Sequence, residues 1–162
     1  MIDLENPILQ DLNPDQLRAV THENGPLLIL AGAGSGKTRV ITRRIAWLVR
    51  ERAVMPSRIL AVTFTNKAAG EMRERVEQLL EGRDAPRWMG TFHSVCLRML
   101  RIHSDLLGFP RDFAVYDDDD QESVLRRIVK EVGEDPKTIR RFSSFIDAWK
   151  NEGVLEPPSG RT

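Results

Sequence analysis

The chain has 162 residues, and its 24 Lys and Arg residues balance 24 Asp and Glu residues to a formal net charge of zero. This balance excludes a protein that binds nucleic acid through a surface that is basic on every side, although it remains compatible with a local basic groove. Because 41% of the residues are hydrophobic and 30% are charged, the composition also excludes a fully disordered chain.

The N-terminal residues 1–16 (MIDLENPILQDLNPDQ) carry acids where a signal peptide carries basic residues, so we expect no export. No apolar run approaches the roughly 20 residues of a membrane span. The single cysteine, Cys96, excludes an internal disulfide and is typical of a reducing compartment. These features predict a cytoplasmic protein with no membrane partner.

The first buried strand is predicted at residues 27–31 (LLILA), a continuous apolar run that leads into glycines. Residues 37–52 then show helical spacing, and the arginines of this segment lie largely off its apolar stripe. The stripe comprises Ile41, Ile45, Leu48 and Val49.

A second strand is predicted at residues 59–64 (ILAVTF), and a shorter extended stretch at residues 87–89. The helix after the second strand has an apolar face that comprises Ala69, Met72, Val76, Leu79 and Leu80. The helix after the extended stretch has an apolar face that comprises Val95, Met99, Ile102 and Leu106. Successive strand and helix units predict βαβ connections, a parallel sheet and therefore an α/β fold.

After Gly108 and Pro110 the pattern changes to two helices without a buried strand between them. Gly133 is expected to end the first helix, and Gly153 with Pro157-Pro158 the second. The apolar positions are Val124, Leu125, Ile128, Val129 and Val132 in the first helix, and Ile139, Phe142, Ile146 and Trp149 in the second. We therefore expect an α/β part over residues 1–110 and a helical part over residues 111–162.

Residues 31–38 (AGAGSGKT) lie between the first predicted strand and helix, which is the context of a phosphate-binding loop. Glycines allow backbone N–H groups to face a polyphosphate, Lys37 can reach its β and γ phosphates, and the Thr38 hydroxyl can ligate Mg²⁺. The expected nucleotide-binding residues are Ala31, Gly32, Ala33, Gly34, Ser35, Gly36, Lys37 and Thr38. Ala31 stands where the strict pattern has glycine. The alternative is a glycine-rich turn without a ligand, and Arg39 is either a nucleotide contact or a solvated helix residue.

With this loop in place, the neighbouring residues resemble the UvrD/PcrA/Rep family of superfamily one DNA helicases. Residues 12–16 (LNPDQ) look like the family's Q motif, which implies that the Gln16 amide recognises the adenine edge. From the residues alone, the same segment is also a capped helix start with Asn13 as N-cap and Pro14 in first position.

Two further segments resemble the family's DNA-binding motifs Ia (residues 63–69, TFTNKAA) and Ib (residues 90–94, GTFHS). The resemblance implies contacts to single-stranded DNA by Phe64, Thr65, Asn66, Lys67, Thr91, Phe92 and His93. Phe64 offers a stacking face for a base, and the polar side chains suit phosphate. The alternatives are that Phe64 belongs to the core, that Asn66 caps a helix and that His93 has a structural role.

Asp117 and Asp118 follow a short apolar stretch and superficially resemble the acids that hold Mg²⁺ in other phosphate-loop proteins. The four aspartates at positions 117–120 also suit a helix N-terminus, where acids oppose the positive end of the dipole. In the helicase family this segment looks like the entry to the helical subdomain 1B, so we favour the helix start.

The resemblance implies a RecA-like P-loop subdomain 1A over residues 1–110, followed by the start of helical subdomain 1B. It also implies the ATP-binding N-terminal portion of an ATP-dependent 3′ to 5′ DNA helicase, with Mg²⁺ as metal. Single-stranded DNA, duplex junctions and the remainder of the helicase chain are the implied partners. Because the family's later motifs are absent, we expect nucleotide binding without efficient turnover. The alternatives are a small self-sufficient phosphotransferase and a non-catalytic module that binds nucleic acid or a protein partner.

Overall fold

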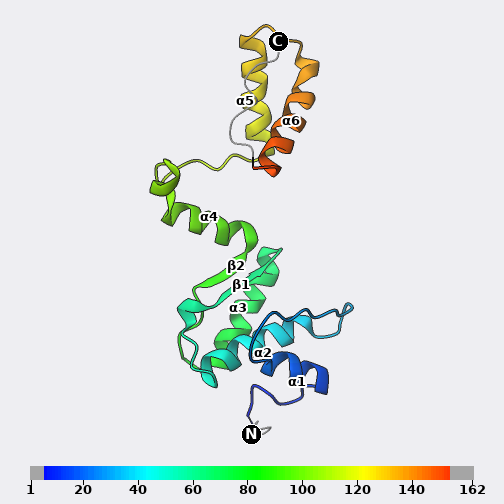
Figure 1. The fold of residues 1–162 in the computed structure, drawn as a ribbon, viewed down its shortest axis with the longest axis vertical. Coiled ribbons are helices and arrows are strands. Elements are labelled where there is room, and N and C mark those ends of the chain that lie inside the picture. Colours follow the sequence, from blue (N-terminus) through cyan, green and yellow to red (C-terminus); the bar gives the residue numbers. More distant parts are fainter. Residues whose placement is uncertain (1–5, 154–162) are drawn as a thin grey trace. The chain divides into compact units, whose positions relative to one another are not determined.

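The computed structural model describes residues 6–153, in which mixed α and β elements form two compact units, Met1–Arg111 and Asp112–Thr162 (Figure 1). The elements in chain order, with η for short 3-10 helices, are α1 (Pro14–Thr21), α2 (Lys37–Arg50), η1 (Pro56–Arg58), β1 (Leu60–Thr63), α3 (Asn66–Leu80), β2 (Trp88–Thr91), α4 (Phe92–Ile102), η2 (Ser104–Leu107), α5 (Asp118–Glu131), η3 (Pro136–Thr138) and α6 (Ile139–Asn151). Among the described residues, no helix combines the length and hydropathy needed to cross a membrane.

The sheet of the first unit consists of β1 and β2, which pair in parallel and are connected through α3. The pairing runs from Leu60 opposite Trp88 to Thr63 opposite Thr91. The βαβ connection predicted for this part of the sequence is therefore confirmed. Its consequence for function is that the carboxyl ends of both strands lie side by side, where ligands of open α/β sheets bind.

The core of the first unit forms where α2 packs against both α1 and α3 (Figure 1). The largest fully buried aliphatic side chains are Ile8, Val20, Val76 and Leu80, each with no exposed surface. Burial of such side chains is the main favourable term in folding. It fixes α1 against the helix that begins at the predicted phosphate loop.

The predicted strand at residues 27–31 is wrong. This segment has no strand assignment, and Leu28 and Leu30 expose 82% and 87% of their surface. A continuous apolar run is buried as a strand only between neighbouring strands and covering helices. The sheet of the described residues is limited to β1 and β2, so nothing in it pairs with this run, and only one of the two expected βαβ units forms.

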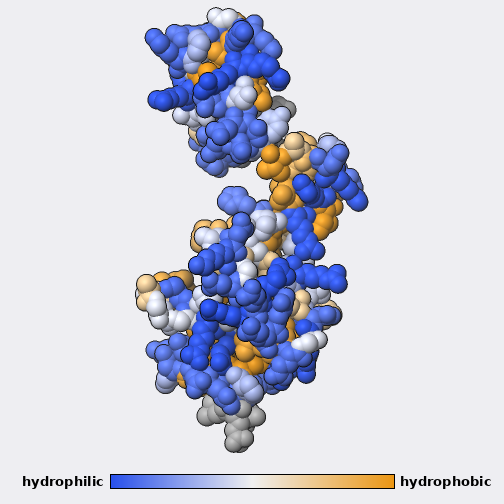
Figure 2. Space-filling model, turned by 180° about the vertical axis from the view of Figure 1, so that it is seen from behind, coloured by the Kyte–Doolittle hydropathy of each residue, from blue (hydrophilic) through white to orange (hydrophobic). Residues whose placement is uncertain are grey.

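Several of the predicted apolar faces also differ from the structure; for example, Ile128 of α5, its C-cap Val132 and Phe142 of α6 are exposed. In α2, Ile41 is 46% exposed, while Thr42, Ala46 and Trp47 are buried. In α4, only Val95 is buried. Figure 2 shows apolar surface gathered over α4 and η2, where Met99, Ile102 and Leu106 are exposed. The helical spacing of apolar residues therefore predicted these helices correctly. It did not predict which face of each helix packs against another element.

The second unit is a helical hairpin in which α5 and α6 are joined through η3. Its small core comprises Leu125, Val129 and Ile139, with Ile146 packed against it. Gly133 ends α5 in the left-handed conformation (φ 75°), and the N–H of Glu134 donates to the oxygen of Val129 at 3.0 Å. This is a Schellman C-cap, which confirms the predicted helix stop. The predicted breaker Pro157-Pro158 lies outside the described residues.

Candidate functional site

The start of α1 places Gln16 against residues 31–38, called the phosphate loop from here on. Asn13 is the N-cap of α1, and its side chain accepts the backbone N–H of Gln16 at 2.8 Å. Oε1 of Gln16 accepts the N–H of Asn13 at 3.1 Å, which completes a capping box. Nε2 of Gln16 donates to the backbone oxygen of Ser35 at 3.1 Å. The expected helix cap is present, and one of its side chains also bonds to the phosphate loop.

The phosphate loop turns through two glycines in the left-handed region, Gly34 (φ 73°) and Gly36 (φ 85°). A Cβ at Gly36 would lie 2.9 Å from Nε2 of Gln16, so the close approach of α1 also requires glycine there. α2 begins at Lys37 without a side-chain cap. Its first N–H groups therefore have no intrahelical partner, and together with the helix dipole they favour an anion.

Lys37 folds back over the phosphate loop. Its Nζ donates to the backbone oxygens of Ala31 at 3.0 Å and Gly32 at 2.5 Å. Thr38 follows in the first turn of α2. Lys37 and Thr38 are both exposed. An ammonium group has three donors, so Lys37 can exchange loop oxygens for phosphate oxygens without a change of backbone.

A cavity of about 250 Å³ lies between α1 and the phosphate loop. It is lined by Asn13, Asp15, Gln16, Ala19, Ile29, Leu30, Ala31, Ser35, Lys37 and Val40. The predicted nucleotide-binding residues Gln16, Ala31, Ser35 and Lys37 therefore face one space. The other predicted residues of the phosphate loop do not line this cavity. They are Gly32, Ala33, Gly34, Gly36 and Thr38.

Arg39 is not brought to this cavity. Its Nη2 lies 3.8 Å from Oδ2 of Asp11. With Thr42 and Arg43 it lines a separate cavity of about 380 Å³. The two arginines and the threonine share a side of α2 that differs from the side on which Lys37 reaches the loop.

The carboxyl ends of β1 and β2 carry an exposed aromatic pair. The rings of Phe64 and Phe92 have centroids 5.2 Å apart and are inclined by 44°. Phe64 exposes 86% of its surface and Phe92 44%, so the alternative that Phe64 belongs to the core is wrong. Because exposed aromatic faces stack on nucleobases, this pair forms a candidate base-binding platform.

The polar residues beside the aromatic pair fall into two groups. Thr65 and Thr91 are the N-caps of α3 and α4, and their hydroxyls accept the N–H groups of Ala68 and Ser94, each at 3.2 Å. The α3 cap is therefore Thr65, so the alternative that Asn66 caps a helix is wrong. Thr91 is buried, with 7% of its surface exposed. Asn66, Lys67 and His93 in the first turns of these helices are exposed.

Comparison with known proteins identifies the family from which these features come. The family described as UvrD/REP helicase N-terminal domain matches residues 12–160. The chain belongs to this family. Membership confirms the resemblance to this family that the sequence indicated, and it implies a P-loop fold, of which the described residues contain a two-stranded parallel sheet.

Relatives within the UvrD/REP family are called ATP-dependent DNA helicase PcrA. The protein of that name from Bacillus subtilis (strain 168) is 50% identical over 156 residues, which cover 95% of this chain and 21% of the relative. Those from Staphylococcus aureus (strain Mu50) and Staphylococcus epidermidis are 48% identical over 149 residues, covering 91% of this chain and 20% of each relative. The chain thus spans about a fifth of the length of these relatives.

Arg43 and Arg44 of α2 are functional candidates that sequence reasoning did not single out. Both are half-buried, and their guanidinium groups donate to backbone oxygens of residues 7–22. Burial lowers the pKa of both side chains from the ordinary value; for Arg43 the nearby Arg39 lowers the pKa further and Asp11 raises it. In the sequence both arginines lie off the apolar stripe of the helix and therefore look solvated. Their acceptors are backbone oxygens, which no residue type identifies in a sequence.

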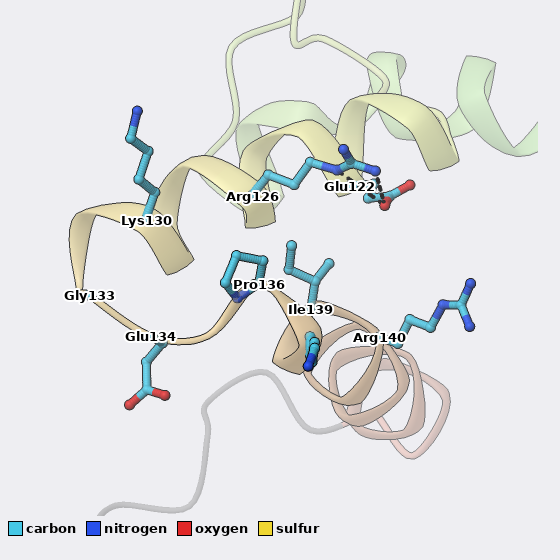
Figure 3. Close-up of a pocket in the computed structure, with 9 residues that line it drawn as sticks. Glu122, Arg126, Lys130, Gly133, Glu134, Pro136, Ile139 and Arg140 are labelled. Carbon is cyan, nitrogen blue, oxygen red and sulfur yellow. Dashed lines mark hydrogen bonds and ion pairs between the residues drawn. The ribbon is translucent and has the colours of Figure 1, made fainter.

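A larger groove of about 900 Å³ lies in the second unit, at the bend between α5 and α6 (Figure 3). Arg126 pairs with Glu122 at 2.6 Å across one turn of α5. Lys130 and Glu134 extend away from each other in Figure 3. The lining therefore mixes both charge signs, whereas the smaller cavity at the phosphate loop lies beside the uncapped start of α2 and is the better anion site.

Asp117 has a structural role at the start of α5. Its side chain accepts the N–H of Asp120 at 2.8 Å, and Oδ2 of Asp120 accepts the N–H of Asp117 at 3.3 Å. This reciprocal pair is a capping box. The favoured assignment of these acids to a helix start is therefore confirmed, and residues 113–116 before them do not form a strand.

Replacing Asp117 with alanine should lower the free energy of unfolding by about 1 kcal/mol, the usual contribution of an N-cap. Asp117→Asn should leave it nearly unchanged, because an asparagine oxygen caps equally well. Urea titration followed by far-UV circular dichroism measures both variants. Equal losses for the two variants would show that the carboxylate charge, and not the cap, is what α5 requires.

Proposed function

We propose that this chain binds ATP with Mg²⁺ in the cavity between α1 and the phosphate loop. The observation that carries the proposal is the convergence of Gln16, Ser35 and Lys37 on one cavity beside the uncapped start of α2. The left-handed conformation of Gly34 and Gly36 fits a polyphosphate cradle, and the absence of a Cβ at Gly36 lets Gln16 approach the loop. Lys37 would hold the β and γ phosphates, and Thr38 would supply a hydroxyl to the metal.

Gln16 is proposed to read the adenine edge. Its amide has two N–H donors and an oxygen with two lone pairs. The bonds to Asn13 and Ser35 use one donor and one lone pair. One donor and one acceptor remain, which matches the N7 acceptor and the N6 donor of adenine.

We propose that the carboxyl ends of β1 and β2 bind single-stranded DNA. The exposed pair of Phe64 and Phe92 supports stacking with bases. Asn66, Lys67 and His93 are exposed next to it and suit contacts to phosphate. Thr65 and Thr91 contribute by capping the helices that present these residues.

For the complete protein we propose ATP-dependent 3′ to 5′ DNA helicase activity, by analogy with the relatives named ATP-dependent DNA helicase. The partners would be single-stranded DNA, duplex junctions and the remainder of the helicase chain, in the cytoplasm. Among residues 6–153 no group of three or more His, Cys, Asp and Glu side chains could hold a metal ion. We propose that Mg²⁺ binds together with the nucleotide. Phosphoryl transfer also needs an oriented water and a neutralising arginine, so we propose binding by this chain without efficient turnover.

Two titrations of the 162-residue chain test the proposal. A fluorescent ATP analogue with Mg²⁺ should bind saturably and be displaced by ATP, while a labelled single-stranded oligonucleotide should bind weakly and lose affinity as salt is raised. Tripolyphosphate should also displace the analogue, because the loop recognises phosphate through its main chain. Absence of displacement by both ATP and tripolyphosphate would refute the nucleotide site.

A further inference from the structure

Two neighbouring arginines of α2 hold the two ends of the segment that carries Gln16. Nη1 of Arg43 donates to the backbone oxygens before α1, those of Pro7 (2.9 Å), Ile8 (2.6 Å) and Gln10 (2.9 Å). These oxygens belong to the turn that leads into the N-cap of α1. Their bonds to one charged donor tie this turn to α2.

Nη1 of Arg44 makes the equivalent contacts at the other end of α1, with the backbone oxygens of Ala19 (3.1 Å), Val20 (3.1 Å) and His22 (2.8 Å). The last carbonyl groups of a helix have no intrahelical partner and form the negative end of its dipole. The half-buried Arg44 guanidinium therefore finds both hydrogen bonds and favourable charge there. α1 is bound at both ends to the helix that begins at the phosphate loop.

The hydrogen bond from Gln16 to Ser35 adds a third attachment, this one between α1 and the phosphate loop. α1 is then attached to the loop and α2 at three places, namely the Gln16 amide, Arg43 and Arg44. The aliphatic core between α1 and α2 stabilises the fold. Apolar packing alone does not define one arrangement of the helices, because a core can become less specific in its packing while it remains stable. The two Nη1 atoms share four N–H donors among six backbone oxygens and so define the position of residues 7–22 along α2 more closely, because hydrogen bonds weaken steeply with distance and angle.

The orientation of the Gln16 amide matters for the base that it can recognise. Oε1 faces the N–H of Asn13 and Nε2 faces the oxygen of Ser35, so the amide cannot turn over without losing both bonds. Adenine presents an N6 donor beside N7, whereas guanine presents an O6 acceptor there. An amide held in this orientation therefore favours adenine, provided that α1 keeps its place.

We propose that Arg43 and Arg44 are positioning residues that set the place of Gln16 relative to the phosphate loop and thereby the preference for adenine over guanine nucleotides. This inference rests on the proposed function, in which the loop holds phosphate and Gln16 contacts the base. It predicts that the arginines affect recognition of the base and not of the phosphates.

The test compares displacement of a fluorescent ATP analogue by ATP, GTP and tripolyphosphate, each with Mg²⁺. Arg44→Met keeps the aliphatic stem and removes all donors, so the ratio of ATP to GTP affinity should fall about three- to tenfold, as for one lost hydrogen bond. The affinity for tripolyphosphate should change less than twofold. Arg44→Lys should restore most of the ratio, because an ammonium offers three donors for three oxygens.

Arg50→Met is the matched control. Nη1 of Arg50 donates to the backbone oxygen of Leu79 at the end of α3, so this arginine caps a helix that is remote from Gln16 in sequence. It should leave the ratio unchanged. If Arg44→Met does not fold, Arg44→Gln, which retains one amide donor group, should give an intermediate ratio. The inference is overturned if these Arg44 variants keep the wild-type ratio, or if they weaken ATP and tripolyphosphate equally. Failure of the wild-type chain to bind tripolyphosphate and ATP would instead refute the proposed function itself.

Discussion

Replacing Lys37 with alanine is expected to weaken binding of a fluorescent ATP analogue by about one to two orders of magnitude. A hydrogen bond that involves a charged group contributes about 1.5–3 kcal/mol, and each 1.4 kcal/mol is a factor of ten in affinity. The ammonium of Lys37 lies over the phosphate loop, within 3.0 Å of the oxygen of Ala31, from where it can reach a bound phosphate. Fluorescence titration in the presence of Mg²⁺ measures the change.

The fold should tolerate this substitution. Lys37 is exposed, and surface changes away from a cap usually alter stability by less than about 0.5 kcal/mol. Lys130→Ala, which removes an exposed lysine from α5, is the matched control and should leave nucleotide affinity unchanged. Equal affinities of Lys37→Ala and Lys130→Ala would mean that the loop does not bind phosphate through its lysine.

Local sequence chemistry predicted the parts of the site that depend on a few consecutive residues. The glycines of the phosphate loop, the cap at Asn13 and the start of α2 at Lys37 all follow from rules that act within one turn of chain. The pairing of β1 with β2 followed from the order of strands and helices. That pairing then placed Phe64 and Phe92 together, although they are 28 residues apart, and both were expected at the DNA site.

The parts that could not be predicted depend on partners distant in sequence. The apolar run at residues 27–31 satisfies every local rule for a buried strand, but a strand also requires a neighbour, and β1 and β2 pair with each other. Arg43 and Arg44 look like solvated arginines by periodicity. Their acceptors are backbone oxygens 22 to 36 residues away, and every residue type provides such an oxygen.

Replacing Phe64 with alanine is expected to lower affinity for single-stranded DNA by about 1–3 kcal/mol, the usual contribution of an aromatic ring that stacks on a base. The ring exposes 86% of its surface, so it is available to a base without rearrangement of the core. Fluorescence anisotropy with a labelled oligonucleotide at low salt measures the change, because the phosphate contacts weaken as salt is raised.

Loss of folding cannot account for such a change. Phe64 contributes to the fold mainly through its ring contact with Phe92, and an aromatic pair contributes about 0.5–1.5 kcal/mol at most. Phe64→Trp keeps a stacking face and should retain DNA affinity, whereas Leu106→Ala removes a side chain of similar exposure, 84%, and should have no effect. If Phe64→Ala binds the oligonucleotide as tightly as Leu106→Ala does, bases do not stack at the carboxyl end of β1, and the DNA path must follow another face of the first unit.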